Sequence, residues 1–582
     1  MRLSAFLAVL LLSGAATAAK PNVVVILADD QGWGDLSVHG NTNLKTPNID
    51  SLAKDGVLFE RLFVCPVCSP TRAEFLTGRY HPRGGVRDVS TGGERLNLEE
   101  RTIADHFKAA GYKTATFGKW HNGTQYPYHP NGRGFDEYYG FTSGHWGDYF
   151  GPPLDHNGEQ VRGKGYITDD LTDHARSFAT ANKDKPFFCY LALNTPHSPM
   201  QVPDPSWDRF KNAELKLRAT PGTKEDLPHT RAALAMCENI DDNVGRLLKM
   251  LDELKIADNT IVLYFSDNGP NGFRWNDGMK GRKGSTDEGG VRSPLLMRWP
   301  GHIPSGTRIP QIAGAIDLLP TLAELSDVKL AGGKPLDGTS LASLLLGKKV
   351  EWSDRTLFSH WNGKVSARTQ QYRLDAAGKL FDMVKDPGQL KDVTAEQAGI
   401  TKQLTSAVEV WKQDVLPGIA KKDDRPFTVG YHQFPIATLP ARDGVPHGKV
   451  QRSAKAPNCS YFTNWISKDD SMTWEIETAT AGRYEAVVYY TCSKADVGST
   501  VELGFQNARF TGTITEAHDP PLMGDEHDRT PRAGESYVKD FKPLSLGIVE
   551  LPKGRGPLTL KATKVTGKQV MDVRSVVLTL QK

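Results

Sequence analysis

The pentapeptide Cys68-Ser69-Pro70-Thr71-Arg72 combines residue types that could attack and hold a negatively charged ester. It precedes Ala73 to Gly78, a run that can be helical. Ser69 is a good N-cap, and Pro70 suits the first helical position because its missing N–H is not needed there. We therefore expect Cys68 at a helix N-terminus, where free N–H groups and the helix dipole favour an anion. A single cysteine among apolar neighbours is, however, more often an inert buried thiol than a nucleophile.

Two groups of hard oxygen ligands follow β-rich runs. Asp29-Asp30 comes after Asn22 to Leu27, and Asp267-Asn268 comes after Thr260 to Phe265. Carboxylate and amide oxygens suit Ca²⁺ or Mg²⁺ better than zinc. Open α/β sheets hold their ligands at the carboxyl ends of strands, which is where both groups would lie. Each group alone is also an ordinary turn sequence, so either one by itself is a weak indication of a metal site.

The string C-x-P-x-R, followed by Leu76-Thr77-Gly78-Arg79, resembles the signature of the type I sulfatases, in the alkaline phosphatase superfamily. In that family the cysteine is converted after synthesis to formylglycine, an aldehyde that works as its hydrate. The resemblance implies a sulfate ester hydrolase in which Arg72 holds the hydrated aldehyde made from Cys68. It also implies one divalent ion, Ca²⁺ or alternatively Mg²⁺, bound together with the modified residue by four side chains: Asp29, Asp30, Asp267 and Asn268.

Three further strings match the same family over roughly residues 20 to 415. The lysine of Gly118-Lys119-Trp120-His121 would contact a sulfate oxygen, and its histidine would be the base that lets the sulfated hemiacetal collapse to the aldehyde. In Thr195-Pro196-His197, the histidine would be the acid for the leaving alcohol. In the block from Gly281 to Pro294, Lys283 would be the second sulfate lysine. Arg282 stands where the family commonly has glycine, which leaves the path of this loop open; it and Lys280 are expected to be solvated.

These residues need a scaffold that brings distant strand ends together. Strand-like runs alternate with helical patterns, which predicts an α/β fold with a mainly parallel sheet covered by helices on both faces. The resemblance implies the alkaline-phosphatase-like version of this fold. The expected helices are Glu99 to Ala110 and Arg231 to Leu254, and the expected strands are Asn22 to Leu27, Lys113 to Phe117, Pro186 to Leu193, Thr260 to Phe265 and Leu295 to Trp299.

The α/β region is assigned to residues 19–350, and the pattern of predicted strands and helices changes after it. Short strands and a helix from about 398 to 412 resemble the small antiparallel sheet that closes the sulfatase fold, assigned to 351–416. Residues 417–442, rich in Pro, Lys and Asp, are predicted to be a linker. From 443 to 582 alternating short strands predict a β-sandwich. This accessory domain weakly resembles carbohydrate-binding modules, and both glycan binding and structural support remain open.

Residues 1–18 have the basic start, short apolar run and A-x-A end of a signal peptide, with cleavage before Ala19. We therefore expect export to the periplasm or the extracellular space. No later stretch is long and apolar enough to span a membrane. The net charge of +3 over 582 residues gives no reason to expect nucleic acid as a partner. Cys459 and Cys492 could pair, but six cysteines are too few for a disulfide scaffold.

The sequence thus predicts an exported sulfatase that acts on sulfated carbohydrates, with a formylglycine-generating or equivalent maturation enzyme as a second partner. Hydrolysis of phosphate or phosphonate esters is the close alternative. If Cys68 stays unmodified, the chain could instead be a non-catalytic sulfated-glycan binder. Candidate sugar contacts are Arg87, Asp88, His156 and the stretch Gly144 to Phe150, although Trp146 and Phe150 could equally be core aromatics.

Overall fold

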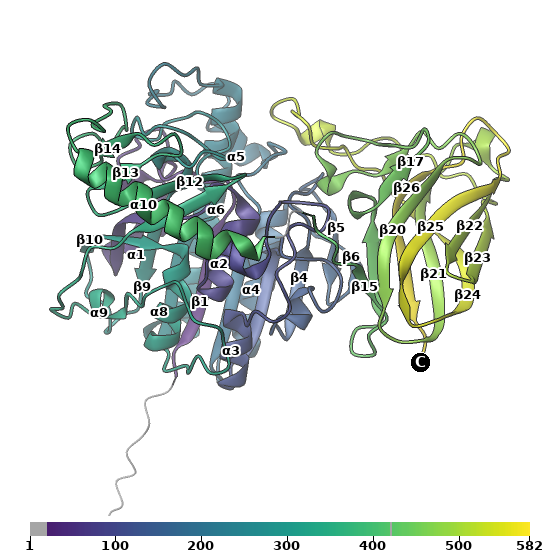
Figure 1. Cartoon of the computed structure of the whole chain (residues 1–582), viewed down its shortest axis with the longest axis horizontal. Coiled ribbons are helices and arrows are strands. Elements are labelled where there is room, and N and C mark those ends of the chain that lie inside the picture. Colours follow the sequence, from purple (N-terminus) through teal and green to yellow (C-terminus); the bar gives the residue numbers. More distant parts are fainter. Residues whose placement is uncertain (1–19, 420–421) are drawn as a thin grey trace, which may run out of the picture.

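The structure is a computed structural model that describes residues 20–419 and 422–582. The predicted signal peptide, residues 1–18, lies outside the described residues. Figure 1 shows an α/β lobe built from the first part of the chain and a separate β lobe built from the last part. A small sheet and the long helix α10 (Ala398–Val415) lie across the α/β lobe.

A ten-stranded sheet forms the centre of the α/β lobe, in the order β10-β2-β9-β8-β1-β7-β3-β4-β5-β6. The predicted strands β8, β1, β7 and β3 run parallel, as expected, and β4, which was not predicted, continues the parallel arrangement. β9 pairs antiparallel with both β2 and β8, and β5 pairs antiparallel with both β4 and β6, so the sheet is mixed toward its edges. The strands are β1 Asn22–Ala28, β2 Val57–Phe63, β3 Lys113–Lys119, β4 Glu137–Phe141, β5 Pro153–His156, β6 Glu159–Arg162, β7 Phe187–Ala192, β8 Thr260–Ser266, β9 Arg292–Arg298 and β10 Thr307–Gly314.

The central strand β1 is buried on both faces, as its β-branched sequence predicts. Val24 and Ile26 belong to one apolar cluster, and Val23 and Val25 to another. The first cluster packs against α1 (Pro47–Lys54), α4 (Ile167–Ala181) and α6 (Leu227–Glu253). The second packs against α2 (Cys68–Thr77), α3 (Ile103–Ala109), α8 (Leu318–Leu325) and α9 (Ala342–Leu345). The sheet is therefore covered by helices on both faces.

Three predicted helix starts are wrong. α2 begins at Cys68 with Val67 as its extended N-cap, so Ser69 is not the cap and Pro70 is not the first helical residue. α3 begins only at Ile103, because Thr102 and Asp105 cap each other's backbone N–H groups in a capping box. α6 begins at Leu227, because the side chain of its N-cap, Asp226, accepts the N–H of His229.

A four-stranded antiparallel sheet follows, with strands β11 Leu357–Trp361, β12 Lys364–Arg368, β13 Tyr372–Leu374 and β14 Leu380–Asp382. α10 covers this sheet and packs Leu404, Val408 and Trp411 against Val365 and Leu374. This arrangement has the antiparallel sheet and the following helix that the sequence predicts.

The β lobe is a sandwich of two six-stranded sheets around one apolar core. Two short strands lie within the predicted linker: β15 (Phe427–Val429) pairs with β20, and β16 (Ile436–Pro440) pairs with β26. Pairing partners far along the chain fix these two strands, which the composition of residues 417–442 could not indicate. The remaining strands are β17 Val445–His447, β18 Gln451–Arg452, β19 Phe462–Thr463, β20 Ser471–Thr478, β21 Gly482–Thr491, β22 Thr500–Phe505, β23 Ala508–Thr513, β24 Lys542–Leu551, β25 Gly554–Lys564 and β26 Asp572–Leu580.

The two lobes share a polar interface that includes buried charges. Arg442, next to β16, forms a 2.8 Å ion pair with Glu94 of the α/β lobe, and both side chains are buried. All six cysteines are free, including Cys459 and Cys492, so the pairing left open by the sequence does not form. Among the described residues, none of the helices combines the length and apolar composition needed to cross a bilayer.

Candidate active site

The candidate residues converge at one edge of the central sheet. Asp29 and Asp30 follow β1, Asp267 follows β8, Lys119 ends β3 and His197 lies shortly after β7. These four strands are parallel neighbours, so their carboxyl ends meet at the same edge. The helix α2 adds Cys68 and Arg72 from the side. The sheet order therefore explains why residues from five separate stretches share one site.

The acidic side chains form a tightly linked, buried group. Asp267 Oδ1 accepts the backbone N–H of Asp30 at 3.1 Å. Asn268 Nδ2 donates to Asp30 Oδ1 at 2.8 Å. The backbone N–H of Asp29 donates to the carbonyl of Thr195 at 3.0 Å, which ties β1 to the loop that carries His197. These contacts fix the directions of the acidic side chains.

Three cations face this acidic group. Arg72 donates to Asp267 Oδ2 at 2.9 Å and to the carbonyl of Lys119 at 2.7 Å. The ammonium group of Lys119 donates to Asp29 Oδ2. Lys283 Nζ lies 2.6 Å from Asp30 Oδ1. Fixed cations of this kind can hold the oxygens of an anionic ester.

Burial and charge set the protonation preferences here. Burial opposes ionisation of Asp30, but the charges of His197 and Lys283 hold its pKa below the usual range. Burial, together with the nearby charge of Asp29, raises the pKa of Asp267 to about 7. Burial also raises the pKa of the Cys68 thiol. A thiol in this environment is a poor thiolate nucleophile.

Two buried oxygens at the site are unsatisfied. Asp29 Oδ1 and Asn268 Oδ1 have no hydrogen-bond partner among the described residues. Oxygens of Asp29 and Asp267 lie within 4.8 Å of each other and of Cys68 Sγ. Buried oxygens left unpaired between carboxylates are costly, and a hard divalent cation would satisfy them. The residues present therefore fit the predicted Ca²⁺ or Mg²⁺ site.

His197 is held by the loop after β7. Its Nδ1 lies 2.7 Å from the carbonyl of Ser198, so Nδ1–H donates there, while Nε2 lies 3.6 Å from Asp30 Oδ2. Nε2 is thus the nitrogen that faces the acidic group and could carry a transferable proton. Burial lowers the pKa of His197 to about 4.

His121 follows β3 with the left-handed φ of 61°. Its Nε2 lies 2.8 Å from the carbonyl of Val89, so that nitrogen carries the hydrogen. Its Nδ1 is buried without a partner among the described residues and remains able to accept a proton. A Cβ at Gly144 would lie 2.6 Å from His121 Nε2, so only glycine lets that loop approach the ring so closely. Burial, followed by the charge of Lys119, lowers the pKa of His121 well below its usual value.

The predicted sugar contacts do not all reach the site. Within the stretch Gly144 to Phe150, His145 does, since the rings of His145 and His197 stack with centroids 5.9 Å apart, whereas Phe150 packs against Tyr166 and His527. Trp146 stacks on Phe141 and lies under Arg574 of the sandwich. His156 instead packs against Tyr139 and His174 at the edge of the sheet.

Four other predicted positions lie in loops near the site. Arg87 and Asp88 directly precede Val89, the residue that contacts His121. Arg282 is exposed, as predicted, and its guanidinium donates to the carbonyl of Asn271 at 3.0 Å. Lys280 pairs with Asp287 instead of with the acidic group. The loop therefore presents Lys283, and not its basic neighbours, to Asp30.

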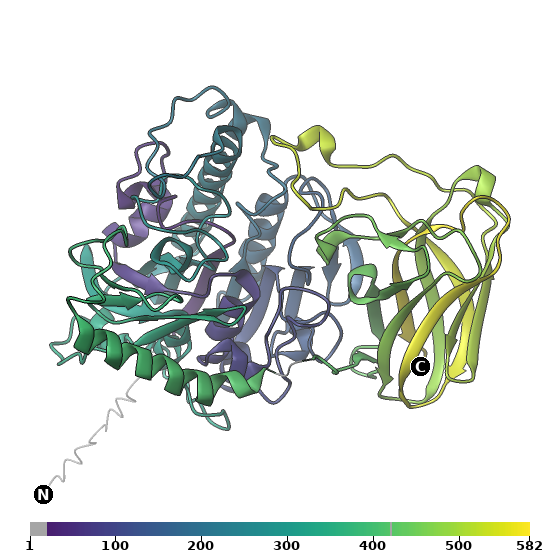
Figure 2. The ribbon, with the colours of Figure 1, turned by 45° about the horizontal axis from the view of Figure 1, so that its top comes forward.

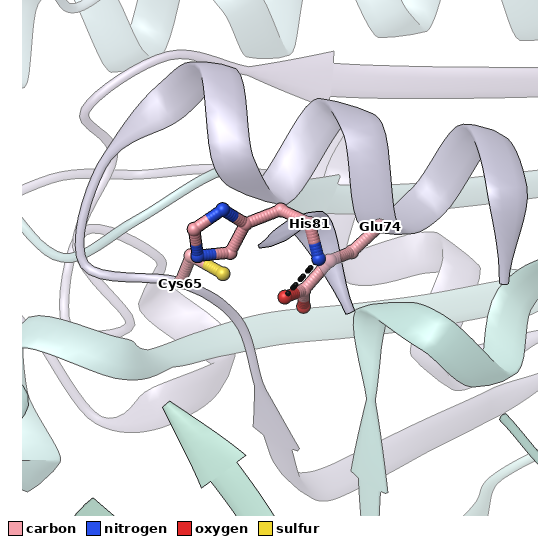
Figure 3. A group of neighbouring side chains, drawn as sticks. All are labelled: Cys65, Glu74 and His81. Carbon is pink, nitrogen blue, oxygen red and sulfur yellow. Dashed lines mark hydrogen bonds between the residues drawn. The ribbon is translucent and has the colours of Figure 1, made fainter. Parts of the chain in front are cut away.

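Figure 3 shows a second group of chemically versatile side chains: Glu74, which belongs to α2, with Cys65 and His81, which precede and follow that helix in the chain. Glu74 accepts the backbone N–H of His81 at 3.2 Å. Burial raises the pKa of Glu74 to about 8 and lowers that of His81 to about 3, so both are neutral at pH 7. The nitrogens of His81 are occupied by the carbonyl of Val86 and by His360. We interpret this group as a neutral hydrogen-bonded anchor for the helix that carries Cys68.

The sequence did not indicate that the sandwich reaches the site. Ser143 Oγ donates to the carbonyl of Asn458 at 2.7 Å, and Ser198 Oγ donates to Glu535 at 2.5 Å. Asn458 lies in a short 3₁₀ helix of the sandwich and Glu535 in one of its loops, both more than 300 residues downstream of their partners. No local motif marks either residue, so only the folded chain could identify them.

Comparisons with known proteins support one family. A family model described as Sulfatase matches residues 21–328, and one described as N-sulphoglucosamine sulphohydrolase, C-terminal, matches residues 283–414. N-acetylgalactosamine-6-sulfatase of Mus musculus is 32% identical over 385 residues, covering 60% of this chain and 70% of that protein. Arylsulfatase A of Homo sapiens is 31% identical over 477 residues, covering 69% and 88%. The crystal structure of Ps i-CgsB in complex with k-i-k-neocarrahexaose matches with a TM-score of 0.62 and 32% identity, covering 69% and 95%.

Proposed function

This chain belongs to the sulfatase family of sulfuric ester hydrolases, and from that premise we propose that it removes sulfate from sulfated carbohydrates. The carbohydrate class is supported by two relatives: N-acetylgalactosamine-6-sulfatase is named for a sulfated sugar, and Ps i-CgsB was solved with an oligosaccharide. The single observation that carries the proposal is the convergence of Cys68, three cations and His197 on one buried acidic group.

The roles follow from the contacts of each side chain. Lys119 and Lys283 would bind the sulfate oxygens and neutralise their charge. Arg72, held by Asp267, would orient residue 68. His197 would protonate the leaving oxygen through Nε2, since its Nδ1–H is engaged by Ser198. The negative charge of a bound sulfate ester favours the imidazolium form, and so offsets the effect of burial on the pKa of His197.

A metal ion and a modified residue 68 would complete the proposed site. Asp29, Asp30, Asp267, Asn268 and residue 68 would hold one Ca²⁺ or Mg²⁺, which when bound polarises oxygens that carry negative charge. Cys68 would be converted to formylglycine, whose hydrated aldehyde supplies the nucleophilic hydroxyl. His121, with its proton on Nε2, has Nδ1 free to accept a proton from residue 68. Residues 1–18 would direct export, and a maturation enzyme would act on Cys68.

The test combines peptide mass spectrometry with a substrate panel. We expect the peptide containing residue 68 to carry formylglycine, and expect hydrolysis of sulfated mono- and disaccharides in preference to their phosphate counterparts. Cys68→Ala should reduce turnover by more than about 10⁴-fold, as loss of a nucleophile does. Cys492→Ala, which removes another buried thiol, should not. Full activity with an unmodified Cys68 would refute the mechanism, and faster phosphate ester hydrolysis would favour the alternative activity.

A further inference from the structure

One segment of the sandwich leaves its own domain and lies along the α/β lobe. This segment, residues 514–541, connects β23 to β24, and we call it the clamp loop. Figures 1 and 2 show it in yellow-green, extending from the sandwich toward the part of the α/β lobe that contains α5 (Asp204–Asp208). Most connections between consecutive secondary-structure elements are far shorter than this, and long ordered loops are commonly functional.

The clamp loop binds the chain segment that carries His197. Gln201 Nε2 donates to the carbonyl of Gly524 at 2.6 Å and to Asp528 Oδ1 at 2.9 Å. The backbone N–H of Arg529 donates to the carbonyl of Met200 at 2.9 Å. These bonds hold the residues directly after His197 against the sandwich.

Glu535 ends a hydrogen-bonded chain that leads to the imidazole ring. Its Oε2 accepts the backbone N–H groups of Ala533 and Gly534 at 3.2 and 3.1 Å. Its Oε1 accepts the hydroxyl of Ser198 at 2.5 Å. The carbonyl of the same serine accepts His197 Nδ1–H at 2.7 Å. Glu535 therefore fixes the residue that sets both the tautomer and the orientation of His197.

We propose that the accessory β-sandwich is part of the catalytic apparatus, with Glu535 as a positioning residue that acts on His197 through Ser198. This inference rests on the proposed function, because it assigns His197 as the acid for the leaving oxygen. A misplacement of about 1 Å in a catalytic group can cost about 10²-fold in rate. The carboxylate of Glu535 thus assists protonation of the leaving group from a distance, by keeping His197 in position.

The test compares two substrates whose leaving groups depend differently on protonation. A sugar alcohol leaves poorly without a proton, whereas 4-nitrophenolate leaves well without one. We expect Glu535→Gln to lower kcat about 10- to 100-fold on the best sulfated sugar of the substrate panel, with KM nearly unchanged, and less than about 3-fold on 4-nitrophenyl sulfate. Glu516→Gln is the matched control, since Glu516 lies in the same loop but is exposed and pairs with Lys542.

A second variant separates positioning from structural damage. Ser198→Ala breaks the same chain but keeps the carbonyl that binds His197, so its effect and that of Glu535→Gln should not add. Equal losses on both substrates would overturn the inference, because a misfolded or poorly binding enzyme loses both. Unchanged kinetics of Glu535→Gln would also overturn it. If the wild-type enzyme hydrolyses no sulfate ester, the proposed function itself fails, and the inference fails with it.

Discussion

Glu74 is a buried residue of α2, the helix that begins at Cys68, and its protonation state leads to a measurable prediction about stability. Burial raises its pKa from 4.5 to about 8. A carboxyl group with a raised folded-state pKa contributes its full stability below pH 4.5, and that contribution is lost as the pH rises toward 8. One proton corresponds to about 1.4 kcal/mol for each pH unit, so the full loss is on the order of 5 kcal/mol.

The perturbation is Glu74→Gln, which keeps the oxygen that accepts the N–H of His81 but cannot ionise. The variant should be about as stable as the wild type at pH 5 and should gain in relative stability, by a few kcal/mol, toward pH 8. The relevant quantity is the difference in free energy of unfolding between the two proteins at each pH, because other titrating groups contribute equally to both.

The assay is calorimetric unfolding of both proteins at pH 5, 6, 7 and 8 and at one scan rate. The unfolding temperature of Glu74→Gln should exceed that of the wild type by an amount that increases with pH. Glu214→Gln, which changes an exposed glutamate, should follow the wild type throughout. A difference between Glu74→Gln and the wild type that stays constant from pH 5 to pH 8 would refute the reasoning, since Glu74 would then be ionised in the folded protein.

Two further predictions concern the metal and the interface between the lobes. Asp267→Asn should abolish sulfatase activity and reduce the bound Ca²⁺ or Mg²⁺ below the one ion per chain expected for the wild type; elemental analysis that finds stoichiometric zinc instead would contradict the metal assignment. Arg442→Met should destabilise the protein by about 3–5 kcal/mol, because it leaves Glu94 buried and unpaired. Arg162→Gln is the control, because it breaks a half-exposed ion pair across the same interface and should cost less than about 1 kcal/mol. If both variants lower the calorimetric unfolding temperature equally, burial of the Arg442–Glu94 pair does not increase its contribution to stability.

The sequence predicts the short strings of the candidate site, because most of them lie close to the end of a strand or the start of a helix; the string with Lys283 lies in a loop between β8 and α7. Asp29 follows a β-branched run whose burial on both faces is a local property of its sequence. The strands β7 and β8, which flank β1, were also predictable, because a continuous run of hydrophobic residues is typical of a strand buried on both faces of a parallel sheet. The convergence of Asp29 with Asp267 and Lys119 was expected from the resemblance, and the pairing of the strands produces it.

Other features depend on contacts between residues far apart in the chain, and no local pattern encodes them. Glu535 meets Ser198 across 337 residues, and its surrounding sequence looks like an ordinary loop. The strands β15 and β16 lie in a stretch whose composition is that of a linker, yet β20 and β26 supply their hydrogen-bond partners. Sequence alone determines which residues can do chemistry and which segments must be buried, because those are properties of side-chain type and spacing. Which buried groups face one another, and so whether the sandwich reaches the active site, is decided only when the whole chain packs.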